Sequence, residues 1–172
     1  MGKGYGIKCA ACDYGLSVTE GVGMMYSPNA VFRGRCNDPS QNWSIASPDG
    51  YCEHDKPLLL SLVKNMKIKE NALTLLAGGA CPDNDYGHEL YTCPKCMRLS
   101  NWFYFKLIST TGDFEPDYKC SECDTSLTRV EAKRGNDGRI TLTCRNHQNV
   151  NWKCPDCGGG QLVSTGDFIQ WD

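Results

Sequence analysis

The stretch ELYTCPKCMRLSNWFYFKL, residues 89–107, places a Cys-x-x-Cys pair between two runs that are rich in apolar and aromatic residues. Two cysteines three positions apart in a tight turn can point both sulfurs at one tetrahedral ion, while amides of the turn hydrogen-bond the thiolates. This spacing occurs four times in the chain, at Cys9 and Cys12, Cys93 and Cys96, Cys120 and Cys123, and Cys154 and Cys157. The repetition predicts two metal sites, each made of four cysteines.

The number of cysteines supports this interpretation. The chain has 12 cysteines, and its N-terminus lacks the apolar core of a secretion signal, so a disulfide framework is the weaker explanation. A single pair would also fit buried thiols or a redox motif of the thioredoxin kind. Four pairs favour zinc, with two ions and room for a third, and iron is the alternative because it uses the same tetrahedral cysteine geometry.

Composition and charge narrow the function classes. The 172 residues are 40% hydrophobic, and no apolar run approaches the roughly 20 residues that a membrane span requires, so we expect a cytoplasmic protein with no membrane contact. The formal net charge is -2 with thiols counted as neutral. Two sites of four thiolates and one divalent ion bring the charge near about -6, which is unfavourable for a polyanionic partner.

The four pairs can be combined into sites in two ways. Consecutive pairing encloses a long segment, 13–92, and a shorter one, 124–153, and it predicts two self-contained domains, 1–107 and 108–172. The other combination joins the second pair to the third across the short segment 97–119 and requires the outer pairs to meet across the whole chain. We favour consecutive pairing for its chain order and low closure cost. The expected fold class is small and β-rich, with two zinc ribbons built from rubredoxin-like knuckle hairpins.

A helical insertion is expected within the first ribbon, at about 55–79. Asp55 can cap the helix, Pro57 suits its first turn, and the glycines at 78–79 can end it. Its apolar positions recur at helical spacing and are expected to pack on the ribbon strands, namely Leu59, Leu62, Val63, Met66, Leu73 and Leu76. Residues 101–108 are typical of a strand, and 133–143 of a hairpin with its turn at 136–138.

The opening MGKGYGIKCAACDYGLSVTEGVGMMYSP, the later ELYTCPKC and the late WKCPDCGGG together resemble a family of small, largely uncharacterised zinc-ribbon (Cys-x-x-Cys) proteins of anaerobic Firmicutes. The resemblance covers about 1–28 and 88–100, with a looser fit from Lys119 onward. It implies that the cysteine pairs are metal ligands, and it implies no activity. The chain departs from the family pattern at Asp13, Met97 and Asp124, where a glycine often follows the knuckle, and this puts the local turn geometry in question.

Several further cysteines and histidines could serve as additional metal ligands. A third zinc site could combine Cys36, Cys52, His54 and Cys81, although free cysteines that behave as small buried hydrophobic residues are the default. Cys144 and His147 repeat a ligand spacing beside the fourth pair. They could replace a pair, stabilise a neighbouring turn or have no chemical role.

No enzyme motif is complete. GHELYT lacks the second histidine of a zincin helix, and no His-x-Glu precedes a Pro-Cys-x-x-Cys as in a zinc deaminase. A closed shell of four thiolates also leaves no position for a reacting water. We therefore expect no catalytic residues and no organic cofactor, and three non-enzymatic classes remain: a docking module, a rubredoxin-like iron electron carrier, and a structural subunit of a larger assembly.

The docking class comes first, with a protein partner ahead of nucleic acid. In the strand at 101–108, one alternating set is expected to face the core and the other to be available to a partner. The available set is Trp102, Tyr104 and Lys106, and the core set is Phe103, Phe105 and Leu107. A basic contribution is expected from Lys119, Arg129, Lys133, Arg134, Arg139 and Arg145. The alternative is that both sets are buried.

Overall fold

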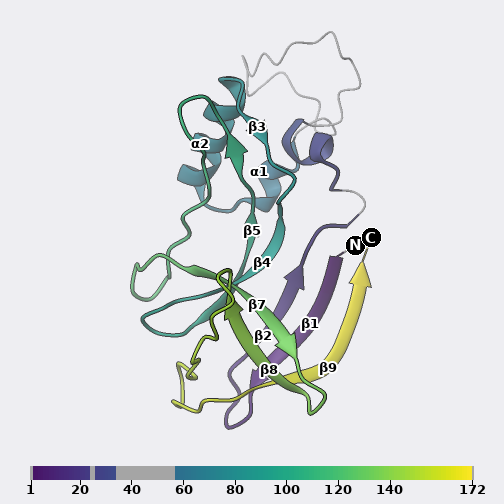
Figure 1. Cartoon of the computed structure of the whole chain (residues 1–172), viewed down its shortest axis with the longest axis vertical. Coiled ribbons are helices and arrows are strands. Elements are labelled where there is room, and N and C mark those ends of the chain that lie inside the picture. The colour runs from purple at the N-terminus through teal and green to yellow at the C-terminus, as the bar shows by residue number, and fades with distance from the viewer. Residues whose placement is uncertain (1, 24–25, 34–56, 172) are drawn as a thin grey trace. The chain divides into compact units, whose positions relative to one another are not determined.

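A computed structural model describes residues 2–23, 26–33 and 57–171 of the chain (Figure 1). These residues form two compact units. Unit 1 comprises Met1–Val22, Gly87–Trp102 and Asp117–Asp172, and unit 2 comprises Gly23–Tyr86 and Phe103–Pro116. The expected division into 1–107 and 108–172 differs from these units, because each unit is assembled from segments that are far apart in the sequence.

Unit 1 is built on one antiparallel sheet of seven strands. Its strands are β1 (Gly2–Cys9), β2 (Gly15–Glu20), β4 (Gly87–Thr92), β5 (Leu99–Tyr104), β7 (Thr128–Arg134), β8 (Arg139–Cys144) and β9 (Leu162–Trp171). The spatial order is β2-β1-β9-β8-β7-β4-β5. The pairing of β1 with β9 joins the N-terminal strand to the C-terminal strand, as the adjacent purple and yellow arrows of Figure 1 show.

The sheet curls until its two edge strands almost meet. Gly21, just after β2, exchanges two backbone hydrogen bonds with His88 of β4, at 2.9 and 3.0 Å. Asn101 of β5 completes the closure with its side-chain amide, which donates to the carbonyls of Thr19 and Glu89 at 2.8 Å each. The Asn101 carbonyl accepts from the amide and the hydroxyl of Thr19. The result is a nearly closed, barrel-like sheet.

The core of unit 1 lies inside this curled sheet. The buried positions alternate along the strands as a half-buried sheet requires, and they include two cysteines of the Cys-x-x-Cys pairs. The core residues are Ile7, Cys9, Val18, Leu90, Leu99, Val130, Leu142, Trp152, Cys154 and Leu162. The expectation of a small β-rich fold is therefore confirmed, but the knuckles belong to a single sheet and do not form two consecutive ribbons.

The hairpin predicted near 133–143 is present as β7 and β8. Val130 pairs with Cys144 at one end of the ladder, and Arg134 pairs with Ile140 at the other. Gly138 has a φ of 78°, a left-handed conformation that glycine adopts without steric cost. Asn136 and Asp137, the other two residues of the predicted turn, do not share this conformation.

Unit 2 contains the predicted helical insertion, but as two helices. They are α1 (Leu59–Leu62) and α2 (Met66–Ala77), and a short π-helical turn, η1 (Asn29–Arg33), precedes them. The chain breaks between the helices because the Asn65 side chain caps α2, accepting a hydrogen bond from the amide of Ile68 at 3.2 Å. The expected cap, Asp55, lies outside the described residues. The end of α2 at Gly78 and Gly79 is as predicted, with a φ of 89° at Gly79.

The apolar face of the helices is also partly different from the prediction. Leu59, Val63 and Leu76 are buried as expected, whereas Met66 is 60% exposed. Met66 begins α2, so the break at Asn65 changes its rotational position relative to α1. Ile68 and Ala72 are the buried residues of α2 that accompany Leu76.

The predicted strand at 101–108 is interrupted and belongs to two sheets. β5 ends at Tyr104, and β6 (Leu107–Ile108) pairs with β3 (Cys81–Pro82) in a separate two-stranded sheet of unit 2. Tyr104 is only 3% exposed, so its expected availability to a partner is wrong. Trp102 and Lys106 retain partial exposure, whereas the core set, Phe103, Phe105 and Leu107, is buried as predicted.

Candidate metal centres

The eight paired cysteines form two groups of four, both in unit 1. Site A consists of Cys9, Cys12, Cys154 and Cys157, and site B consists of Cys93, Cys96, Cys120 and Cys123. Within each group all four sulfurs lie within 4.8 Å of one another. The predicted consecutive pairing of the motifs is therefore wrong, and the nested alternative is correct: the inner pairs share one site and the outer pairs share the other.

Strand pairing produces this nested arrangement. Cys9 ends β1 and lies opposite Leu162 of β9, so the first knuckle is held beside the segment that contains the fourth. Thr92 ends β4 and lies opposite Thr128, the first residue of β7, so the second knuckle is held beside the third. Each site therefore lies where two neighbouring strands leave the same sheet.

The sulfur positions suit a tetrahedral ion. In site A, Cys9 and Cys157 are 3.7 Å apart and Cys12 and Cys154 are 3.5 Å apart. In site B three of the sulfur pairs lie at 3.3, 3.5 and 4.0 Å. A tetrahedron with metal–sulfur bonds of about 2.3 Å has edges of about 3.8 Å, whereas a disulfide bond is about 2.05 Å long. The donor set of four sulfurs fits zinc or iron.

All four knuckles make the same backbone hydrogen bond, and three of them also share a left-handed residue. The first cysteine of each pair donates its amide to the carbonyl five residues later, at Tyr14, Arg98, Thr125 and Gly159, over 2.6–2.9 Å. The residue four positions after that cysteine is left-handed in three cases: Met97 (φ 59°), Asp124 (φ 53°) and Gly158 (φ 74°). Met97 and Asp124 thus hold the turn that a glycine would adopt more easily. Asp13, the corresponding residue of the first knuckle, has no positive φ.

Backbone amides surround the sulfurs of both sites. The amide of Ala11 lies 3.4 Å from the Cys9 sulfur, and that of Gly159 lies 3.4 Å from the Cys157 sulfur. In site B the amide of Cys96 lies 3.5 Å from the Cys93 sulfur. Such donors stabilise thiolate ligands because hydrogen bonds to the charged form favour it.

The four adjacent thiols of a site shift one another's pKa values in opposite directions. Burial, together with hydrogen bonds that the Cys96 thiol donates to the neighbouring sulfurs, raises the pKa of Cys96 to about 12. A hydrogen bond from the Thr125 side chain, with one from Cys93, lowers the pKa of Cys123 to about 6. The shifts divide because the first thiolate to form opposes ionisation of its neighbours. A divalent cation removes this opposition, so all four sulfurs can ligate it as thiolates.

The two cysteines of a pair differ in exposure. The first cysteine of every pair is buried, and the second is more accessible, with Cys157 exposed. The first cysteines therefore anchor each site in the core of unit 1, while the second cysteines face outward.

Three contacts connect site A with the residues just after the second knuckle, which belongs to site B. The indole N–H of Trp152, two residues before Cys154, donates to the carbonyl of Met97 at 2.8 Å. The amide of Leu99 donates to the hydroxyl of Tyr14, two residues after Cys12, at 2.8 Å. Arg98 forms an ion pair with Asp156 at 3.6 Å. These contacts were not predicted from the sequence, although Tyr14 and Trp152 each lie two positions from a paired cysteine.

The additional ligand predictions have mixed outcomes. Cys36, Cys52 and His54 lie outside the described residues. Among the described residues, Cys81 belongs to neither cysteine group and is exposed in β3. Cys144 and His147 also belong to neither group: Cys144 packs against the core of unit 1, and the amide of His147 donates to the Cys144 carbonyl in a turn.

Comparison of the chain with protein-family models, curated proteins and solved structures found no match. The resemblance to a zinc-ribbon family therefore stays a prediction. Among the described residues, no helix is long and apolar enough to cross a membrane.

Proposed function

We propose that the protein is a non-catalytic, metal-binding module that holds one zinc ion in site A and one in site B. The observation that carries this proposal is the convergence of four sulfurs in each site at distances that fit a tetrahedral ion. Zinc is the first choice because a closed shell of four cysteines is a common structural zinc site. A reducing, cytoplasmic compartment would keep these thiols available to the metal.

The test is metal analysis of the pure protein together with its absorption spectrum. Native mass spectrometry is expected to find two ions per chain, and a colourless protein would identify zinc. Visible thiolate-to-iron absorption would instead support the rubredoxin-like electron carrier. Fewer than two ions with all cysteines reduced would contradict the proposal.

A pair of cysteine variants separates ligand loss from general damage. Cys9→Ser removes a buried ligand of site A and is expected to leave one bound ion. Cys144→Ser makes the same chemical change at a half-buried cysteine beside the same core, outside both sites, and is expected to keep two ions. Equal metal content in the two variants would show that Cys9 is not a ligand.

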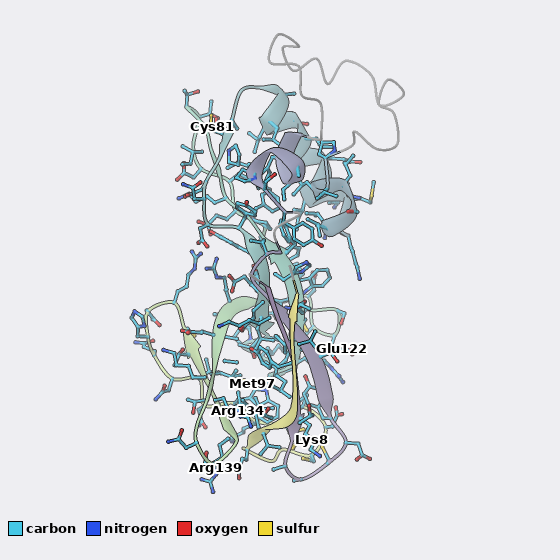
Figure 2. The ribbon with its side chains drawn as sticks, turned by 90° about the vertical axis from the view of Figure 1, so that its right-hand side faces the viewer. Lys8, Cys81, Met97, Glu122, Arg134 and Arg139 are labelled. Carbon is cyan, nitrogen blue, oxygen red and sulfur yellow. The ribbon has the colours of Figure 1, made fainter. Side chains whose placement is uncertain are left out.

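We further propose that the module docks onto another protein, with nucleic acid as the second candidate. Several expected basic residues have an acidic side chain nearby, which weakens their attraction for phosphates. The ion pairs are Lys119 with Asp117 at 2.7 Å, Arg129 with Glu89 at 3.5 Å, Lys133 with Glu131 at 3.4 Å and Arg139 with Asp137 at 3.1 Å. Figure 2 shows Arg134, Arg139 and Lys8 toward the same end of unit 1.

Salt dependence distinguishes these two partners. Binding that neutralises several phosphates loses affinity with a logarithmic slope of about -0.9 per phosphate contact. A flat response of the isolated complex to salt would exclude a phosphate-dominated interface and favour a protein partner. A photo-crosslinker placed at Trp102, which is partly exposed and stacked on Tyr118 at 4.9 Å, should capture that partner more efficiently than one at Thr141. Equal or absent capture would show that the surface around Trp102 is not the docking surface.

A further inference from the structure

We infer that sites A and B bind metal with positive cooperativity, and that residues 97–99 carry the coupling between them. This inference rests on the proposed metal binding and adds a relation between the two ions. Its structural basis is that this short segment follows directly from the knuckle turn of site B, while each of its residues also contacts a residue within two positions of a site A ligand.

Residues 97–99 are fixed by the turn of site B. The amide of Cys93 donates to the Arg98 carbonyl at 2.9 Å, and the amide of Met97 donates to the Cys93 carbonyl at 2.9 Å. The left-handed φ of 59° at Met97 is a conformation that a non-glycine residue holds only when its surroundings enforce it. Metal binding by Cys93 and Cys96 would stabilise this turn, and with it the positions of the Met97 carbonyl and the Leu99 amide.

These two backbone groups hold the aromatic residues of site A. Trp152 is 4% exposed, and its indole N–H has the Met97 carbonyl as its acceptor at 2.8 Å. Tyr14 accepts from Leu99 at 2.8 Å, and its ring lies 6.0 Å from that of Trp152. The Tyr14 carbonyl in turn accepts from the amide of Cys9 at 2.8 Å. An ordered segment 97–99 therefore helps to order both knuckles of site A.

Electrostatics acts in the opposite direction. Each loaded site carries a charge of about -2, so the two sites repel each other. Arg98 reduces this repulsion, because its guanidinium lies 4.0 Å from Glu122 in the third knuckle and 3.6 Å from Asp156 in the fourth. The Arg98 side chain is 42% exposed, so its ion pairs contribute at most about fivefold to an equilibrium constant. The buried Trp152 hydrogen bond contributes about 2- to 12-fold and is the better probe.

The experiment uses the full chain, made metal-free and kept reduced without oxygen. It is titrated with Co²⁺ at free concentrations set by a metal buffer, and native mass spectrometry counts chains that carry no ion, one ion or two ions. Two equal, independent sites give a singly loaded population of about one half at its maximum, and a tenfold coupling lowers it to about one quarter. Two independent sites of unequal affinity give a singly loaded maximum of more than one half. A singly loaded maximum below one half therefore indicates positive cooperativity.

Two tryptophan variants provide the matched comparison. Trp152→Phe removes the donor to Met97 and keeps an aromatic ring, and we expect it to raise the singly loaded maximum toward or above one half. Trp102→Phe also removes an indole N–H, but that group bonds to Ser100 of the same strand at 3.0 Å and should leave the distribution unchanged. If Trp152→Phe does not fold, Tyr14→Phe tests the second contact in the same way.

The outcomes separate this inference from the proposed function. Absence of bound cobalt in the natural chain would overturn the proposed metal binding itself. Two bound ions with a singly loaded maximum that Trp152→Phe does not raise would overturn the coupling through residues 97–99 and leave the metal binding intact. A maximum below one half that responds equally to the two tryptophan variants would show that residues 97–99 do not carry the coupling.

Discussion

The Asn101 side chain offers a sharp test of how the sheet of unit 1 is closed. Asn101→Ala removes two donated hydrogen bonds, to the carbonyls of Thr19 and Glu89 at 2.8 Å, and two accepted ones from Thr19. Each intramolecular hydrogen bond contributes a net ~0.5–1.5 kcal/mol. Because Asn101 is half-buried, water replaces part of this loss. We therefore expect the free energy of unfolding to fall by about 2–4 kcal/mol.

Urea unfolding of the metal-loaded protein measures this change, with thermal unfolding as a second readout. For a chain of this size the loss corresponds to a fall in Tm of roughly 5–12 °C. Metal content is measured for each variant, so that a change in stability is not confused with loss of an ion. Hydrogen exchange at Thr19 and Gly21 should also accelerate, because these amides bond across the gap.

Asn146→Ala is the matched control. Asn146 is exposed and its side chain bonds only locally, to Gln148 in the same turn, so its substitution should change stability by no more than about 0.5 kcal/mol. Asn101→Asp should be at least as damaging as Asn101→Ala, because a carboxylate oxygen would face two carbonyls. If the two alanine variants were equally stable, the closure role of Asn101 would be refuted.

Two further predictions concern the knuckle turns and one half-buried carboxyl. Asp124→Gly should stabilise the metal-loaded protein and Gly158→Ala should destabilise it, each by about 1 kcal/mol in urea unfolding. The reason is that both positions have a left-handed φ, which glycine tolerates best. Opposite signs would contradict this account of the turns. Burial raises the pKa of Glu20 above its ordinary value of 4.5, although the hydrogen bond from Tyr5 at 2.6 Å opposes the shift. The folded chain therefore binds this proton more tightly than the unfolded chain, and the unfolding free energy should decrease as pH rises from 4.5 through the raised pKa. Glu20→Gln should remove this decrease, and an unchanged pH profile in the variant would assign it to other groups.

The candidate ligand cysteines could be selected from the sequence because the chemistry of their turn is local. A Cys-x-x-Cys turn has the same requirements wherever it occurs, and its fourfold repetition is visible without any tertiary information. The β7–β8 hairpin was predictable for the same reason, since its turn and strand residues are adjacent in the chain. By contrast, the break before α2 depends on whether Asn65 caps a helix or lies within one, and a continuous apolar pattern conceals that choice.

The availability of Tyr104 could not be predicted because it depends on which sheets the strand joins. Alternation along 101–108 assumes one strand with one solvent face. The chain instead ends β5 at Tyr104 and enters a different sheet at Leu107. Tyr104 is buried at this change of sheet, while Trp102 keeps part of its exposure.

The pairing of the cysteine motifs was the main error, and closure entropy explains why the sequence did not decide it. Consecutive pairing closes the segments 13–92 and 124–153 as two separate loops. Nested pairing first closes the short segment 97–119 at site B. Site A then closes one larger loop, which consists of 13–92 and 124–153. The cost of closure grows as (3/2)RT ln n, so the two schemes differ by less than about 0.1 kcal/mol in total. Consecutive pairing therefore has no real advantage over nested pairing in the free energy of loop closure.

Strand pairing therefore selects between the two schemes, and it gives the sites different relations to folding. Site B needs only the pairing of β4 with β7 across the short loop at 97–119, whereas site A needs β1 and β9 from the two ends of the chain. A short loop closes at lower entropic cost than a long one. Site B can thus be completed by local structure, while a complete site A requires the N-terminal strand to be in place beside β9. An ion in site A consequently stabilises the whole sheet of unit 1, because its four ligands come from segments that only the finished fold brings together.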